Sequence, residues 1–263
     1  DLVRSRGLGD VYKRQNKYML GAFISLSLVA LWKINYWLAI VISMIVLAFI
    51  GLLVERLIYR PLHDQPHINS FIAAIGLLLL LEGMAFAIWG GEWQRFPFAY
   101  KQNIQFFGIT ITLHRLLVIF AAVSLIILLQ LFIKKTTLGW TIEAVAQDRE
   151  GAQIVGINVY FVSSLAFAIG TALAAAASSL IAPVYLVYPA MGSMPLIKAF
   201  VVIILGGMGS LPGAVIGGYL LGLVESLAGG YISMIYADLF AFAVLVIVLA
   251  IKPTGLLGKG AEG

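Results

Sequence analysis

The sequence predicts an all-α fold: a polytopic transmembrane helical bundle with seven or eight spans, one of them short or broken, plus a cytoplasmic helix. Three observations predict it. Of the 263 residues, 62% are hydrophobic and 11% are charged, against roughly 45–50% and about 25% in soluble domains. The mean hydropathy is +1.02. The apolar residues also gather in runs, several of which approach the roughly 20 residues that a membrane-spanning helix needs.

Eight apolar segments supply the expected spans. In chain order they are residues 18–32, 36–58, 70–89, 113–133, 159–182, 196–205, 212–228 and 235–251. A bilayer core is about 30 Å thick, so segment 196–205 is too short to cross it alone. Segment 159–182 is crowded with alanine, glycine and serine, which predicts a face on which neighbouring helices pack.

The first 15 residues differ from the rest of the chain. DLVRSRGLGDVYKRQ is polar and basic, and it lacks the apolar stretch of a signal peptide. GLGDVYKRQ resembles a translated sequencing-adapter scar, so we interpret residues 1–15 as non-native sequence. The alternative is a natural, disordered basic tail. Residues 16–263 are predicted to form a single membrane domain.

The distribution of Lys and Arg predicts an orientation, because cytoplasmic loops are enriched in both. Placing the polar residues 134–158 in the cytoplasm also puts Arg56, Arg60, Lys252 and Lys259 there. The basic residues left outside are then Lys33, Arg95, Lys101, Arg115 and Lys198. The cytoplasmic set is the larger of the two once the basic residues of 134–158 are included, which favours this topology.

Residues 134–158 form a long polar interruption between two spans and predict a structured cytoplasmic segment. Helix-forming residues occupy 141–155, and Gly156 is placed to end a helix there. The apolar side of this helix would carry Ala144, Ala152 and either Ile154 or Val155. Such a helix suits two roles: it could lie on the membrane surface, or it could be a rigid projection to which a soluble motor protein binds.

The glycine-rich segment near residue 210 predicts a broken helix followed by a tightly packed one. The break would be formed by Gly206, Gly207 and Gly209. Ser210 would then cap the next helix, with Pro212 in its first turn. Glycines recur at spacing four, first at Gly209, Gly213 and Gly217 and then at Gly218 and Gly222. This spacing lets a neighbouring helix approach closely, while broken helices often border substrate pathways, so packing and pathway roles both remain open.

Three carboxylates fall inside predicted spans, where ionisable groups are costly and suggest function. Glu82 and Glu225 could contact a substrate ammonium group, or they could hold a helix pair together through a hydrogen bond. Asp238 lies near a helix start, where a carboxylate interacts favourably with the helix dipole.

Several kinds of site are excluded or disfavoured by the residues themselves. The chain has no cysteine, which excludes disulfides and thiol chemistry. His63 and His67 flank Asp64 at a metal-like spacing, but Pro66 interrupts the helix that such a pair requires. GLLGKG near the C-terminus lacks the spacing and the Ser or Thr of a phosphate-binding loop. The net charge of +5 is dispersed and forms no basic face for nucleic acid. We therefore expect no catalytic residue, metal or cofactor in this chain.

Three stretches carry a resemblance to a known family: EAVAQDREGAQIVGINV from residue 143, KAFVVIILGGMGSLPGAVIGGYLLGLVESL from residue 198 and KPTGLLG from residue 252. They resemble the permease subunits of bacterial ABC importers for branched-chain and other hydrophobic amino acids. YMLGAF from residue 18 and INSFIAAIGLLLLLEG from residue 68 match more loosely. The resemblance covers residues 17–258 and implies that the family's first transmembrane helix is missing from this chain.

The resemblance implies alternating access in the bacterial inner membrane, driven from outside the chain. It implies a second related permease subunit, two cytoplasmic ATPase subunits that use ATP and Mg²⁺, and a periplasmic or lipid-anchored substrate-binding protein. The ATPase contact would be a coupling helix with Glu143, Ala144, Asp148, Arg149, Gly151 and Gly156, the charged three forming its polar rim. The pathway or helix break would include Glu82, Gly206, Gly207, Gly209, Pro212, Gly213 and Glu225.

Other functions remain as alternatives. An ABC permease for urea, short amides or sugars would have a similar sequence pattern, because apolar walls select weakly between substrates. A secondary transporter driven by protons or sodium would be expected to cluster carboxylates within the membrane, and this sequence has few. A membrane enzyme or assembly scaffold is a third alternative.

Overall fold

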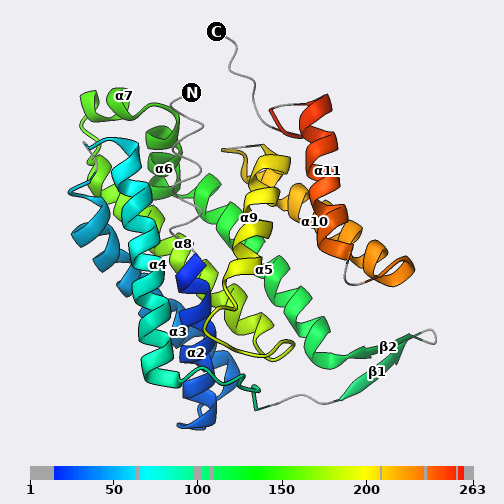
Figure 1. Ribbon diagram of the computed structural model, residues 1–263. Coiled ribbons are helices and arrows are strands. Elements are labelled where there is room, and N and C mark those ends of the chain that lie inside the picture. The colour runs from blue at the N-terminus through cyan, green and yellow to red at the C-terminus, as the bar shows by residue number, and fades with distance from the viewer. Residues whose placement is uncertain are drawn as a thin grey trace. The chain divides into compact units, whose positions relative to one another are not determined.

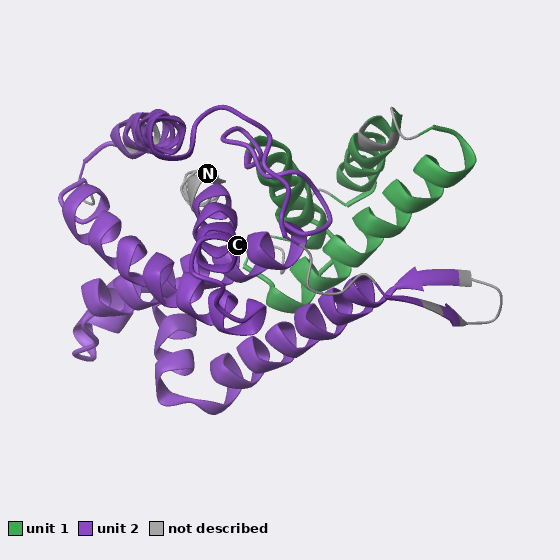
Figure 2. Ribbon diagram, turned by 90° about the horizontal axis from the view of Figure 1, so that it is seen from below, with its two compact units in different colours: residues 1–12, 193–263 green, residues 13–192 purple. Residues whose placement is uncertain are grey.

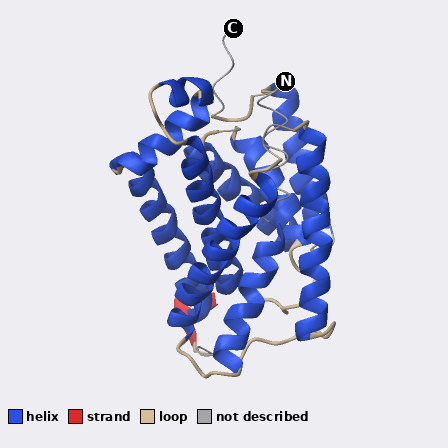
Figure 3. Ribbon diagram, turned by 90° about the vertical axis from the view of Figure 1, so that its left-hand side faces the viewer, coloured by secondary structure: helices blue, strands red, loops and turns tan. Residues whose placement is uncertain are grey.

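The computed structural model describes residues 15–62, 65–97, 102–106, 109–207, 209–233, 236–252 and 254–257. The chain divides into two compact units, a larger one within residues 13–192 and a smaller one that holds residues 193–263 (Figure 2). Figure 3 shows that the described chain is almost entirely helical, with one short pair of strands.

The larger unit contains most of the elements labelled in Figure 1. They are α2 (Gln15–Ala30), α3 (Tyr36–Val54), the π-helical turn η1 (Glu55–Tyr59), α4 (His67–Trp89), β1 (Asn103–Phe106), β2 (Ile109–Thr112), α5 (Leu113–Lys135), α6 (Thr137–Gln147), α7 (Arg149–Ile154) and α8 (Val159–Ile181). The smaller unit contains α9 (Ser193–Gly206), α10 (Leu211–Tyr231) and α11 (Ala237–Ile251).

The helices have the lengths and composition of membrane spans. Among the described residues, five are long and apolar enough to cross a bilayer: α3 with η1, α4, α5, α8 and α10. Three shorter apolar helices, within α2, α9 and α11, accompany them. The prediction of a polytopic helical membrane fold is confirmed, and the short segment near residue 200 is one of these shorter helices.

The core of the larger unit lies where α8 packs on α2 and α3. Small residues allow the close approach. A Cβ on Gly21 of α2 would lie 2.7 Å from the Cα of Ala175 in α8, and Gly51 of α3 faces Thr171 in the same way. The Ser179 hydroxyl of α8 donates to the Gly21 carbonyl at 3.2 Å. The packing face predicted for residues 159–182 is therefore confirmed.

Two local features of the larger unit were not predicted. Residues 103–106 and 109–112 pair as antiparallel strands, with Asn103 opposite Thr112. The last residues of the second predicted span form the π-helical turn η1, a distortion that is often found at functional sites. Glu55 opens this turn, is 6% exposed, and accepts a hydrogen bond from the Ser164 hydroxyl of α8.

Candidate functional site

The predicted cytoplasmic helix is two helices. A single helix over residues 141–155 was expected, but α6 ends at Gln147 and α7 begins at Arg149. Asp148 separates them with an extended backbone (φ −141°, ψ 110°), and its side chain accepts a hydrogen bond from the Gly151 amide at 3.0 Å. Asp is among the strongest N-cap residues, so Asp148 ends one helix and starts the next.

The apolar side expected for this segment is also different. Ala152 alone is buried, at 5% exposure. Ile154 and Val155 are 86% and 74% exposed and project from the end of α7, while Ala144 is exposed on α6. Because α7 is a separate helix that begins after Asp148, its side chains do not continue the helical periodicity of α6. The result is an exposed apolar tip, defined here as Ile154 and Val155.

Polar residues accompany the apolar tip on the same segment. Glu143 and Asp148 are exposed and Arg149 is half-buried. Gly151 supplies the amide that Asp148 caps. Gly156 has φ +85° and its amide donates to the Gln153 carbonyl at 3.0 Å, which ends α7 as predicted. The segment therefore has the apolar centre and charged surroundings of a docking surface.

A tight corner joins this segment to the long helix α5. The Thr136 hydroxyl accepts from the Gly139 amide at 3.0 Å and donates to the Phe132 carbonyl at 2.7 Å. The Trp140 indole donates to the Lys134 carbonyl at 2.9 Å. Gly139 is buried, and a Cβ there would meet the backbone of α5. The corner between α5 and α6 is thus closely packed and hydrogen-bonded, and no single residue pattern predicted it.

Asp148 can be tested as a helix cap. Replacing it by alanine is expected to destabilise the start of α7 by about 1 kcal/mol and, in a permease of the kind that the sequence resembles, to lower transport, because the apolar tip loses its fixed position. Replacing it by asparagine keeps the cap and removes one exposed rim charge, which contributes little to a contact, so transport is expected to stay within twofold of wild type. Transport rates of both variants at equal membrane abundance make the measurement. Equal losses in both variants would instead assign the effect to the charge of Asp148.

The helix break in the smaller unit forms as predicted. Gly206 ends α9, and the following Gly207 and Gly209 have φ of +98° and +85°, which only glycine adopts readily. The Ser210 hydroxyl caps α10 by accepting from the Gly213 amide at 3.1 Å. Pro212 lies in the first turn of α10.

Only part of the glycine pattern makes the expected close contacts. A Cβ on Gly213 would lie 2.9 Å from the carbonyl carbon of Gly206, and one on Gly217 would lie 2.8 Å from the Val202 carbonyl oxygen. A Cβ on Gly222 would meet nothing within 4 Å. The crossing of α9 and α10 therefore depends on Gly213 and Gly217.

The C-terminal segment closes the end of α9 at this break. The Leu256 and Leu257 amides donate to the carbonyls of Leu205 and Gly206 at 2.8 and 3.1 Å. Gly255 has φ +81°, and a Cβ there would lie 2.6 Å from the Gly207 backbone. The last carbonyls of a helix lack partners within it, so this segment satisfies two of them.

The structure gives the three predicted carboxylates different surroundings. Glu225 forms an ion pair with Lys198, with 2.8 Å between Oε2 and Nζ. Lys198 was counted among the basic residues outside the membrane, and the structure places it in the second turn of α9. Glu82 is half-buried in α4 and has no hydrogen bond or ion pair among the described residues. Asp238 is the second residue of α11, as expected for a first-turn partner, and its side chain lies outside the described set.

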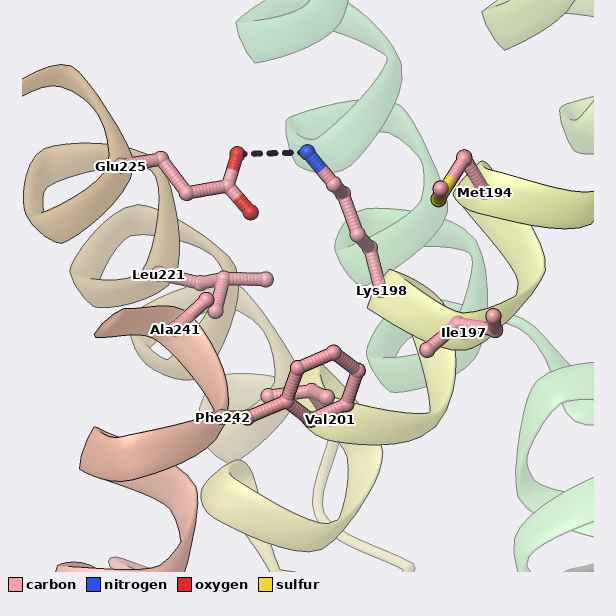
Figure 4. A pocket seen from close by; sticks show the side chains of 8 residues that line it. All are labelled: Met194, Ile197, Lys198, Val201, Leu221, Glu225, Ala241 and Phe242. Carbon is pink, nitrogen blue, oxygen red and sulfur yellow. Dashed lines mark hydrogen bonds and ion pairs between the residues drawn. The ribbon is translucent and has the colours of Figure 1, made fainter. Parts of the chain in front are cut away.

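The ion pair lines a small pocket between the three helices of the smaller unit (Figure 4). The other lining residues are apolar: Met194, Ile197 and Val201 from α9, Leu221 from α10, and Ala241 and Phe242 from α11. A charged pair beside an apolar surface is a suitable arrangement for a ligand that carries both charged and apolar groups.

No group of three metal-ligating side chains occurs among the described residues. His63 and Asp64, which the sequence placed at a metal-like spacing, lie outside the described residues.

Comparison with known proteins gives a consistent family. Residues 14–249 match the family described as branched-chain amino acid transport system / permease component. The high-affinity branched-chain amino acid transport system permease protein LivH of Escherichia coli is 32% identical over 92% of this chain and 83% of its own length. BraD of Pseudomonas aeruginosa, a protein of the same description, is 33% identical over the same shares. A probable LivH of Methanocaldococcus jannaschii is 28% identical over 91% of this chain and 80% of its own. No solved structure matches the chain.

Proposed function

The chain belongs to the family of permease components of branched-chain amino acid transport systems, and from this premise we propose that it is the membrane-spanning permease subunit of an ATP-driven importer. Its substrates are branched-chain or other hydrophobic amino acids, and it is located in the bacterial inner membrane. The observation that carries the proposal is the family match, which includes both the α6–α7 segment and the glycine break.

Three kinds of partner complete the proposed importer. A second, related permease forms the pathway together with this chain, and two ATPases bind the cytoplasmic ends of the two permeases. A receptor outside the membrane delivers the substrate. Hydrolysis of ATP takes place in the ATPases, with Mg²⁺, and this chain contributes no catalytic group.

In this mechanism the ATPase binds the apolar tip, Ile154 and Val155, and the charged residues around it. Closing of the ATPases displaces α6 and α7. The displacement reaches the span α5 through the stiff corner at Gly139, where the Thr136 hydroxyl bonds both helices. A rigid joint is needed because a flexible one would absorb the motion before it reached the pathway. Support for this step comes from the exposure of the apolar tip and from the close packing of Gly139 against the backbone of α5.

Reconstitution tests the proposal. The chain is co-expressed with a second permease, ATPase subunits and a receptor from its own organism, and the purified complex is placed in proteoliposomes. We expect radiolabelled L-leucine to accumulate only when ATP is supplied on the side of the membrane that carries the ATPases and the receptor is supplied on the opposite side. Uptake driven by a proton or sodium gradient without ATP would contradict the proposal. ATP-driven uptake of urea, acetamide or ribose, without uptake of leucine, would support the ATP-driven mechanism and contradict the proposed substrate class.

A further inference from the structure

Only one of the two carboxylate oxygens of Glu225 takes part in its ion pair. Its Oε2 accepts from Lys198 Nζ at 2.8 Å, whereas its Oε1 is buried and has no hydrogen-bond partner among the described residues. Buried polar atoms are nearly always hydrogen-bonded, so an exception calls for an explanation such as an absent ligand. An ion pair that served packing alone would be expected to satisfy both oxygens.

We propose that the Lys198–Glu225 pair and the apolar pocket beside it bind the amino acid during its passage, so that the substrate's charges exchange with those of the pair. The α-ammonium group donates to Glu225, and the α-carboxylate accepts from Lys198. This proposal rests on the proposed function and adds the residues that recognise the substrate.

The charges of the site match those of an amino acid. An α-amino acid carries an ammonium and a carboxylate on the same carbon, so the two groups can contact two protein charges that lie side by side. Inserting the zwitterion between Lys198 and Glu225 replaces one ion pair by two, with the same net charge in the pocket. The Lys198 side chain is 39% exposed, so it remains accessible to an incoming carboxylate.

The apolar lining matches the substrate's side chain. Figure 4 shows Leu221, Val201 and Phe242 grouped on one side of the ion pair. The pocket has room for about one water molecule while the ion pair is closed, so an isobutyl or isopropyl group enters only as the pair opens around the substrate. The group then leaves water for an apolar surface, which is favourable. The charged pair thus recognises what all amino acids share, and the apolar surface favours those with hydrocarbon side chains.

The first test is a cycle of charge removal in the full importer. Lys198→Gln, Glu225→Gln and the double variant are compared for ATP-driven L-leucine uptake with saturating receptor, at equal membrane abundance. We expect each variant, including the double, to fall at least tenfold below wild type. If the pair only holds α9 and α10 together, the double variant leaves no unpaired charge and recovers. Wild-type uptake by the double variant would overturn the proposal, and this holds even if the single variants fail to accumulate.

The second test changes the size of the apolar surface. Ala241→Leu narrows the pocket, while Ala243→Leu makes the same change on an exposed position of α11. Uptake is measured with leucine-loaded and with valine-loaded receptor. Because the receptor is the same for both permeases, a changed leucine-to-valine ratio arises in the permease. We expect the ratio to fall at least threefold in Ala241→Leu and to stay unchanged in Ala243→Leu.

The outcomes separate this proposal from the proposed function. An unchanged leucine-to-valine ratio in Ala241→Leu would overturn the pocket as a recognition site while the wild type still imports leucine. If the wild-type complex does not import leucine at all, the proposed function fails first and this site fails with it.

Discussion

Replacing Gly213 by valine is expected to remove most of the folded protein from the membrane. A Cβ at this position would lie 2.9 Å from the Gly206 carbonyl carbon, so a side chain would collide with the backbone of α9. Overpacking typically costs about 1–3 kcal/mol where side chains can adjust. Backbone adjusts less easily, so we expect a cost at the top of this range or above it. Membrane abundance and the thermal stability of the purified protein measure the loss.

Gly222 provides the matched control for this prediction. It lies on the same helix, α10, but a Cβ there meets nothing within 4 Å. Gly222→Val is therefore expected to accumulate close to the wild-type level and to melt within a few degrees of it. Equal stability of the two valine variants would show that the α9–α10 crossing does not depend on a glycine at position 213.

Replacing Ile154 by aspartate is expected to reduce ATP-driven uptake at least tenfold without loss of folded protein. Ile154 is 86% exposed, so the substitution removes little packing within the chain. In the importer, however, the proposed ATPase contact would bury the new carboxylate against an apolar surface, which is strongly unfavourable without a partner. Uptake, co-purification with the ATPase and membrane abundance are measured together.

Leu31→Asp is the control for the apolar tip. Leu31 is 75% exposed and lies in the turn that follows α2, far in sequence from the α6–α7 segment. It is expected to retain ATPase association. Normal co-purification and uptake by Ile154→Asp would mean that the motor does not use the tip.

Local sequence signals predicted the break in the smaller unit well. Ser210 followed by Pro212 is a strong start signal for a helix, and adjacent glycines allow the left-handed backbone seen at Gly207 and Gly209. These signals act within a few residues of each other, so they require no knowledge of the tertiary fold. The apolar spans were predictable for a similar reason, since bilayer thickness sets their length.

The kink between α6 and α7 could have been predicted from the sequence. Asp148 is a strong N-cap residue and is followed by Arg149 and Glu150, the second an acidic residue suited to a first helical turn. The helix-forming residues of the whole stretch point the other way. They predict a single helix with Ile154 or Val155 on its apolar side.

The polar side-chain pairs between helices could not have been predicted, because they join residues that are distant in the chain. Lys198 and Glu225 are 27 positions apart, and Glu55 and Ser164 are 109 apart. No local spacing relates the members of either pair, and their meeting depends on how whole helices pack. Lys198 was accordingly counted only among the basic residues outside the membrane, and Glu55 was not singled out.

In the proposed mechanism, force from a separate ATPase enters this chain at the end of α7. The chain contains no cysteine, so Ile154→Cys gives it a single thiol, to which a photo-crosslinker is attached before the importer is assembled. We expect an ATPase adduct from position 154, and none from a Leu31→Cys control. A transport-competent complex that gives no ATPase adduct at position 154, or equal adducts at both positions, would contradict this mechanism.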